Sequence, residues 1–122
     1  MKKLLLVENE KSEINRISSV LCNYEYNVKR VGSSAEGLDY IKESHPDLLI
    51  IDLEENEKLA LSLISDTAKK SPRTSILVLV SSLETDATIK SLECGADAFI
   101  HKPIDEGSLS AYLDKRPAQM AM

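Results

Sequence analysis

Two uninterrupted apolar runs, residues 48–51 (Leu-Leu-Ile-Ile) and 76–80 (Ile-Leu-Val-Leu-Val), constrain the fold of this chain more than any other feature. A strand with one solvated face alternates apolar and polar residues, whereas a strand covered on both faces is apolar throughout. Residues 4–7 (Leu-Leu-Leu-Val) form a third run of this kind. We therefore expect a parallel sheet with helices packed on both of its faces.

Helical patterns separate these runs. Apolar residues three or four positions apart predict five helices, marked by Ile14, Ile17 and Leu21, then Leu38 and Ile41, then Leu61, Ile64 and Ala68, then Ile89 and Leu92, then Leu109, Tyr112 and Leu113. Ser12 is expected to open the first helix, and Ser33 with Glu36 forms a capping box before the second. Gly95 is expected to cap the end of the fourth helix.

Two weaker strands complete the alternation. Residues 28–31 are partly polar, which suits the edge of a sheet, and residues 98–100 form a short last strand. Five strands alternating with five helices predict right-handed crossovers between parallel strands. The expected fold is a doubly wound α/β sandwich with a five-stranded parallel sheet.

Length and charge limit the function classes. A chain of 122 residues with 43% hydrophobic residues suits one domain with a real core. We expect that domain to span residues 1–116, and residues 117–122, which lack an apolar pattern, to fray and to begin a linker. The 15 basic residues are scattered, so direct nucleic-acid binding is not expected. No apolar run approaches the length of a membrane span, and we expect a cytoplasmic protein.

The two cysteines do not indicate a metal site. Cys22 and Cys94 lie far apart and outside any C-x-x-C spacing. Both fall in segments with a helical apolar pattern, so we expect buried, reduced thiols.

Polar side chains follow the apolar strands. Glu8-Asn9-Glu10 comes after the first strand, Asp52 after the third, Ser81 after the fourth and Lys102 after the fifth. In open parallel sheets the functional crevice lies beyond the carboxyl ends of the strands, so these groups should meet at one edge. Oxygen ligands suit Mg²⁺, and a carboxylate beside such a cation can attack phosphorus. A lysine and a hydroxyl can hold the oxygens of a transferring phosphoryl group.

Taken together, these segments resemble the receiver domain of bacterial two-component signalling over nearly the whole chain. The matching motifs are Leu-Leu-Val-Glu8-Asn9-Glu10, Leu-Leu-Ile-Ile-Asp52, Val-Leu-Val-Ser81-Ser82 and Gly95-Ala-Asp-Ala-Phe99-Ile-His-Lys102-Pro103. The Lys-Pro pair after a short strand is the most specific of them. With this resemblance we expect a flavodoxin-like strand order of 2-1-3-4-5, numbered along the chain.

The resemblance also implies roles for individual residues. Asp52 would accept a phosphoryl group from a histidine kinase or phosphotransfer protein, and Lys102 would pair with it. Mg²⁺ would be held by Glu8, Asn9, Asp52 and the backbone carbonyl of Glu54. Such a domain is not an enzyme beyond phosphorylating itself and slowly losing the phosphoryl group.

The implied switch involves three further residues. Ser81 would turn its hydroxyl toward the phosphoryl group, Phe99 would report the state to the face formed by the fourth helix, fifth strand and fifth helix, and the bond before Pro103 would be cis. A homodimer through that face is a habit of the family. From the residues alone, Phe99 is better explained as a core residue than as a switch. For Ser81, a turn hydroxyl and a switch hydroxyl are equally good explanations.

Two departures from the family pattern leave an alternative open. The metal pair usually holds two acids, but Asn9 brings no charge, and the loop after Asp52 lacks the usual Met-Pro and Gly. A pseudo-receiver, which keeps the fold and binds partners without phosphate, would show these changes. A doubly wound nucleotide or corrin binder is a third reading, which the lack of a Gly-rich loop after the first strand disfavours.

The acidic surplus is local. The net charge is −5, and six acids cluster after two strands that we expect to be neighbours, namely Glu8, Glu10, Asp52, Glu54, Glu55 and Glu57. This concentration predicts an anionic pocket that depends on a cation.

Overall fold

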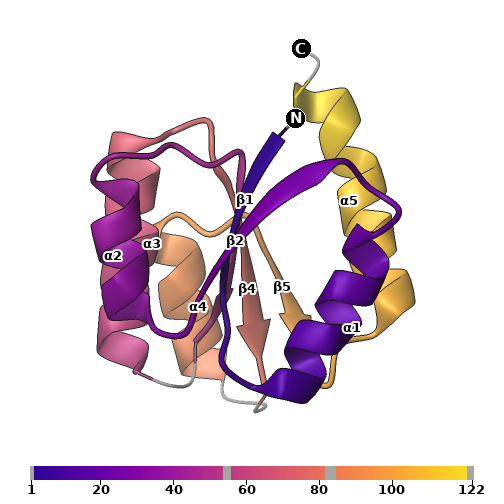
Figure 1. Cartoon of the computed structure of the whole chain (residues 1–122). Coiled ribbons are helices and arrows are strands. Elements are labelled where there is room, and N and C mark those ends of the chain that lie inside the picture. The colour runs from indigo at the N-terminus through magenta and orange to yellow at the C-terminus, as the bar shows by residue number, and fades with distance from the viewer. Residues whose placement is uncertain (1, 54–55, 82–84, 121–122) are drawn as a thin grey trace.

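The computed structural model describes residues 2–53, 56–81 and 85–120. Strands and helices alternate along the chain (Figure 1). The strands are β1 (Lys2–Val7), β2 (Tyr26–Val31), β3 (Leu48–Asp52), β4 (Ser75–Val80) and β5 (Ala98–His101). The helices are α1 (Lys11–Leu21), α2 (Ser34–Ile41), α3 (Glu57–Lys70), α4 (Thr85–Cys94) and α5 (Glu106–Met120).

The strands form one parallel sheet in the order β2-β1-β3-β4-β5. The predicted doubly wound sheet and its flavodoxin-like order are therefore confirmed. Strand β3 is central and buried at every position, as its apolar sequence predicts. Strand β2 lies at the edge, where residues 27–30, three of them polar, are exposed.

Alternate residues of the apolar strands build two cores. Helices α2, α3 and α4 cover one face of the sheet, and α1 and α5 cover the other (Figure 1). Leu5, Leu49 and Val78 face the first group, whereas Leu4, Leu48 and Leu77 face the second. This separation follows from the two-residue period of a strand.

Local signals set most helix ends. Ser33 Oγ accepts a hydrogen bond from the Glu36 amide (3.2 Å), which confirms the capping box of α2. Asn56 Oδ1 caps α3 in the same way, accepting from the Leu59 amide at 3.2 Å. Gly95 follows α4 with a φ of +125°, a backbone conformation that favours glycine.

Helix α1 begins at Lys11, one residue before the Ser12 that the sequence suggests as its start. Glu10 is the N-cap residue but makes no side-chain cap, because its carboxylate is used elsewhere, as described below.

Helix α5 is longer than its apolar stripe predicts. It runs to Met120, past residue 116 and into the segment that we expect to fray. A helix satisfies its backbone hydrogen bonds internally, so it can continue beyond the residues that pack on the sheet. The division into a domain and a linker stays a prediction.

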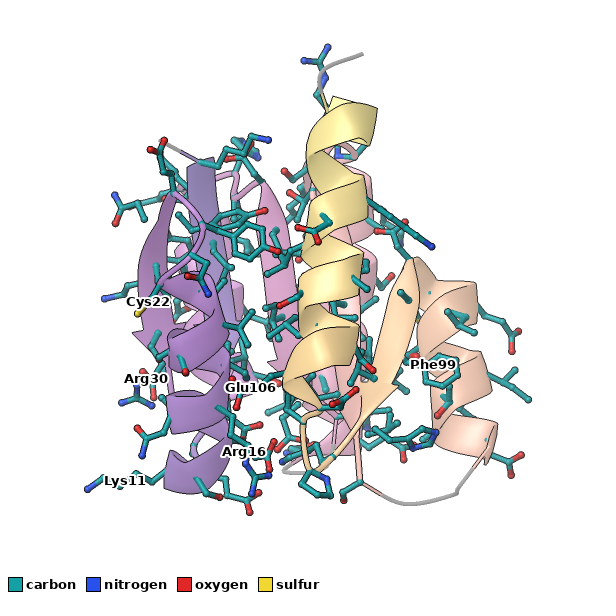
Figure 2. The ribbon with its side chains drawn as sticks, turned by 90° about the vertical axis from the view of Figure 1, so that its right-hand side faces the viewer. Lys11, Arg16, Cys22, Arg30, Phe99 and Glu106 are labelled. Atoms are coloured by element: carbon teal, nitrogen blue, oxygen red, sulfur yellow. The ribbon has the colours of Figure 1, made fainter. Side chains whose placement is uncertain are left out.

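The expectation of two buried thiols is wrong for Cys22. Both cysteines are free, but Cys22 is exposed and Cys94 is partly buried. Cys22 is the C-cap residue just beyond the last buried turn of α1, and Figure 2 shows it on the outside of the molecule. Among the described residues, no helix combines the length and apolarity that crossing a bilayer requires.

Candidate functional site

The carboxyl ends of β1, β3 and β5 converge on the ammonium group of Lys102. Its Nζ lies 3.2 Å from Glu8 Oε2, 3.2 Å from Asp52 Oδ2 and 3.1 Å from Glu10 Oε2. The side chain of Lys102 is only 6% exposed, and that of Glu8 is fully buried. We call these four residues the acid–lysine cluster.

Backbone hydrogen bonds hold the three members that lie at strand ends. The Glu8 amide donates to the Val31 carbonyl (3.2 Å), and the Lys102 amide donates to the Val80 carbonyl (2.7 Å). After Asp52, the Leu53 amide donates to the Leu79 carbonyl at 3.1 Å. The cluster thus sits on backbone that continues the sheet, which makes it more rigid than a site on loops.

The two carboxylate oxygens of Glu8 make different contacts. Its Oε1 accepts hydrogen bonds from the amides of Asn9 and Glu10, both at 3.1 Å. Its Oε2 is buried and makes an ion-pair contact with Lys102, although the geometry is not that of a hydrogen bond. One oxygen therefore shapes the turn into α1, and the other faces the cluster.

The pKa values of both Glu8 and Lys102 are raised by their surroundings. Burial raises the pKa of Glu8, and the negative charge of Asp52 raises it further, against the hydrogen bond from the Glu10 amide and the charge of Lys102. For Lys102, burial alone would lower the pKa, but the hydrogen bond to Glu10 and the charges of Asp52 and Glu8 outweigh it and raise the pKa. Lys102 thus stays an ammonium ion at neutral pH.

The cluster offers two carboxylates to a hard cation. Mg²⁺ is usually bound through one or two carboxylates and keeps several waters, so Glu8 and Asp52 suit it chemically. The buried Glu8 Oε2 accepts no hydrogen bond, and it is the oxygen that would bind such an ion. Within residues 2–53, 56–81 and 85–120, however, no three His, Cys, Asp or Glu side chains are grouped so as to hold a metal by themselves.

Several expected site residues stand apart from the cluster. Asn9 is exposed, and Ser81 is exposed just beyond β4. In the described part of the chain, no hydrogen bond joins either side chain to the cluster. Glu54, the expected carbonyl ligand, lies outside the described residues. The peptide bond between Lys102 and Pro103 is cis, as the resemblance implies.

The expectation that Phe99 is a core residue is wrong, because Phe99 is 42% exposed. Strand β5 is at the edge of the sheet, and Figure 2 shows Phe99 beside β5 on the side of α4. Its ring makes an edge-to-face contact with His101, with the ring centres 5.7 Å apart. Two residues apart on a strand, they share the face opposite to that of Lys102.

Sequence reasoning missed three residues that support the cluster. The sequence places Glu10 only among the clustered acids, whereas its carboxylate binds Lys102. Arg30 on β2 donates from Nη1 to the Glu8 carbonyl at 3.1 Å. Glu13 is buried in the first turn of α1. The sequence did contain a signal for Glu13: it lies four residues before Ile17, so it is on the same face of the helix as the apolar stripe.

The flavodoxin-like sheet with acids and a lysine at the carboxyl ends of its strands defines the class of CheY-like α/β folds. The chain belongs to the response regulator receiver domain family, whose model matches residues 4–114. These domains are parts of two-component systems and are not classical enzymes.

Individual relatives agree with this membership. The transcriptional regulatory protein DltR of Streptococcus agalactiae is 29% identical over 98% of this chain, which spans 54% of that protein. The chain therefore spans about half the length of that relative. A CheY-like receiver domain protein from Methanospirillum hungatei has the same fold, with a TM-score of 0.86, 21% identity and coverage of 98% of this chain and 95% of that one. A response regulator from Thermotoga maritima gives a TM-score of 0.81 at 23% identity, over 94% of this chain and 96% of that one.

Proposed function

We propose that this receiver domain is cytoplasmic and accepts a phosphoryl group on Asp52 from a phosphorylated histidine of a histidine kinase or phosphotransfer protein. The observation that carries the proposal is the buried ammonium group of Lys102, held 3.2 Å from an oxygen of Asp52 and 3.2 Å from an oxygen of Glu8. A lysine in such a place supplies a point charge for phosphoryl oxygens.

The transfer is a displacement at phosphorus by the carboxylate of Asp52. An oxygen of Asp52 attacks phosphorus, a new O–P bond forms, and the P–N bond of the phosphohistidine breaks. The electron pair of that bond stays on the imidazole nitrogen, which then takes up a proton if the neutral ring is to be restored. Lys102 would then pair with the phosphoryl oxygens, because they carry the negative charge once the Asp52 carboxylate has become an acyl phosphate.

A divalent cation fits this scheme because the cluster is short of positive charge. Three carboxylates share one ammonium group, and an incoming phosphoryl group adds further negative charge. Glu8 and Asp52 would hold Mg²⁺, with the amide oxygen of Asn9 and the carbonyl of Glu54 as the other protein ligands. The ion supplies charge neutralisation during the transfer.

The output would be a changed surface on α4, β5 and α5. Ser81, at the end of β4, would turn toward the phosphoryl group, and Phe99 would respond on β5. This face already exposes three large apolar side chains, Ile89, Leu92 and Phe99, which suits a partner or a second copy of the chain. Sedimentation before and after phosphorylation, compared with Phe99→Ala, tests the homodimer.

The deciding experiment is incubation with acetyl phosphate and Mg²⁺, followed by mass spectrometry of the intact protein. We expect a gain of one phosphoryl group that Asp52→Asn abolishes. Asp66→Asn, which removes a carboxylate from α3 away from the sheet edge, is the matched control and should leave the gain intact. No gain at any Mg²⁺ concentration would refute the phosphoacceptor function.

That negative result would favour a pseudo-receiver, an interaction module that works without phosphate. The exposed side chain of Asn9 and the engagement of Lys102 by a third acid, Glu10, are the observations in its favour. Under this alternative, Asp52→Asn would leave partner binding unchanged, whereas substitutions of Ile89 or Phe99 would weaken it.

A further inference from the structure

A buried carboxylate outside the acid–lysine cluster binds the backbone next to Lys102. Glu13, in the first turn of α1, is 3% exposed. Its Oε2 accepts a hydrogen bond from the Ile104 amide at 3.0 Å, across 91 residues of sequence. Its Oε1 accepts from Arg16 Nη1, also at 3.0 Å. Burying a carboxylate costs free energy unless it is paired and hydrogen-bonded, and both conditions are met here.

The amide that Glu13 binds has a particular place in the chain. Ile104 follows Lys102 and Pro103, and proline has no N–H. The Ile104 amide is therefore the first backbone donor after that of Lys102. The Lys102 amide is itself bound to the Val80 carbonyl at 2.7 Å. Two hydrogen bonds thus hold the turn on both sides of the residue that carries the ammonium group.

The two anchors come from different parts of the fold. Val80 ends β4, whereas Glu13 belongs to α1, which packs on one face of the sheet. Ile104 is buried in the core beneath α1 and α5. Figure 2 shows Arg16 on the first turns of α1, and its guanidinium group pairs with the buried carboxylate at 3.0 Å. Helix α1 and the turn after β5 are therefore joined by a specific polar contact as well as by apolar packing.

We propose that Glu13 is a positioning residue, which fixes the turn at residues 102–104 and thereby keeps the Lys102 ammonium group within reach of Asp52. Glu13 touches neither the phosphoryl group nor Asp52, so it acts only through Lys102. Its importance for phosphoryl transfer rests on the proposed function. The placement of Lys102 by Glu13 does not, since it exists in the unphosphorylated protein.

Replacing Glu13 with Leu removes the acceptor, and replacing it with Gln keeps an acceptor but removes the charge. A carboxylate acceptor makes a hydrogen bond roughly twice as strong as a neutral one, so Gln should restore part of the contact. Glu25→Gln is the matched control, because Glu25 is an exposed acid before β2. All proteins are compared at equal folded fraction, as judged by circular dichroism.

The first readout is NMR without phosphate. We expect the Ile104 amide to exchange fastest in Glu13→Leu and at an intermediate rate in Glu13→Gln, with other amides of β5 unaffected. We expect the Lys102 ammonium resonance, which is protected by its three carboxylates, to broaden or disappear in Glu13→Leu. These measurements test the placement of Lys102 even if the wild-type protein takes up no phosphoryl group.

The second readout is the rate of phosphorylation by acetyl phosphate. A displacement of about 1 Å at a reacting group can cost about 100-fold in rate, so we expect Glu13→Leu to be slower by about tenfold or more. Glu13→Gln should recover most of that loss, and Glu25→Gln should match the wild type. A wild-type rate and an unchanged Lys102 resonance in folded Glu13→Leu would overturn the inference. Should the Leu variant fail to fold, faster exchange of the Ile104 amide in Glu13→Gln with an unchanged Lys102 resonance and a wild-type phosphorylation rate would overturn it instead.

Discussion

Lys102 Nζ donates a hydrogen bond of 3.2 Å to Asp52 Oδ2 and so joins the ends of two strands that do not pair with each other. Strand β4 lies between β3, which ends at Asp52, and β5, which ends just before Lys102. The lysine side chain therefore spans the end of β4, where Ser81 follows. Through this contact, the charge of Lys102 belongs to the candidate site and also contributes to the stability of the fold.

Removing the charge of Lys102 should destabilise the domain unless a cation replaces it. In Lys102→Met, Glu8 and Asp52 keep their burial but lose the ammonium group they share. Glu8 keeps its hydrogen bonds from the Asn9 and Glu10 amides, so the cost is that of removing one charged contact from buried carboxylates, about 1–3 kcal/mol. We expect the free energy of unfolding in urea to fall by that amount in chelator, and by less in millimolar Mg²⁺.

Lys42→Met is the control for this variant. Lys42 pairs with Asp39 at 3.3 Å on the exposed surface of the molecule, where a salt bridge contributes between 0 and about 1 kcal/mol. Equal losses for the two variants would contradict a special role of Lys102 in stability.

The ionised form of Glu8 should lower the stability of the fold at neutral pH. The pKa of Glu8 is raised in the folded protein, chiefly by burial, so the folded state binds this proton more readily than the unfolded state. The resulting destabilisation is complete above the pKa of Glu8 in the folded protein. It disappears as the pH falls toward the ordinary pKa of a glutamate. We expect Glu8→Gln to raise the free energy of unfolding at pH 7 and to lose this advantage near pH 4.

Urea denaturation at a series of pH values measures this effect. Glu93→Gln, which changes an exposed acid on α4, should show no such dependence. A wild type that is more stable than Glu8→Gln at neutral pH would show that the ion pair with Lys102 outweighs burial.

An acid at position 9 should tighten metal binding. The Asn9 amide brings no charge to the site, and restoring an Asp there should strengthen Mg²⁺ binding by about tenfold, which is about 1.4 kcal/mol. Titration calorimetry measures the change directly. Asn15→Asp, on the exposed side of α1, adds the same charge away from the site and should leave the affinity nearly unchanged. Equal affinities for the two variants would exclude residue 9 as a ligand.

A side chain at position 95 should destabilise the end of α4. Gly95 has a φ of +125°, and a Cβ there would lie 2.6 Å from the Cβ of Ala68. We expect Gly95→Ala to cost about 1–3 kcal/mol in the free energy of unfolding, because the backbone is strained for any other residue. In Gly107→Ala the new Cβ would lie 3.7 Å or more from its nearest neighbours, and this variant should gain about 0.5–1 kcal/mol. A neutral Gly95→Ala would mean that α4 can end in another way.

The sequence alone determined the sheet and the meeting of its strand ends. The apolar runs ending before Glu8 and Asp52 required strands buried on both faces, and only a parallel sheet with helices on both sides buries them. Once the strands are parallel, their carboxyl ends lie at one edge, so the approach of Asp52, Glu8 and Lys102 follows from chain order and strand period.

Only the tertiary structure decided which partners the side chains at that edge contact. Whether Glu10 binds a metal or Lys102 depends on the turn into α1, which the Glu8 carboxylate fixes through two amides. Whether Phe99 is buried depends on what covers an edge strand, which strand periodicity does not specify. The hydrogen bond from Ile104 to Glu13 joins residues 91 positions apart, and a local sequence pattern does not predict such a contact.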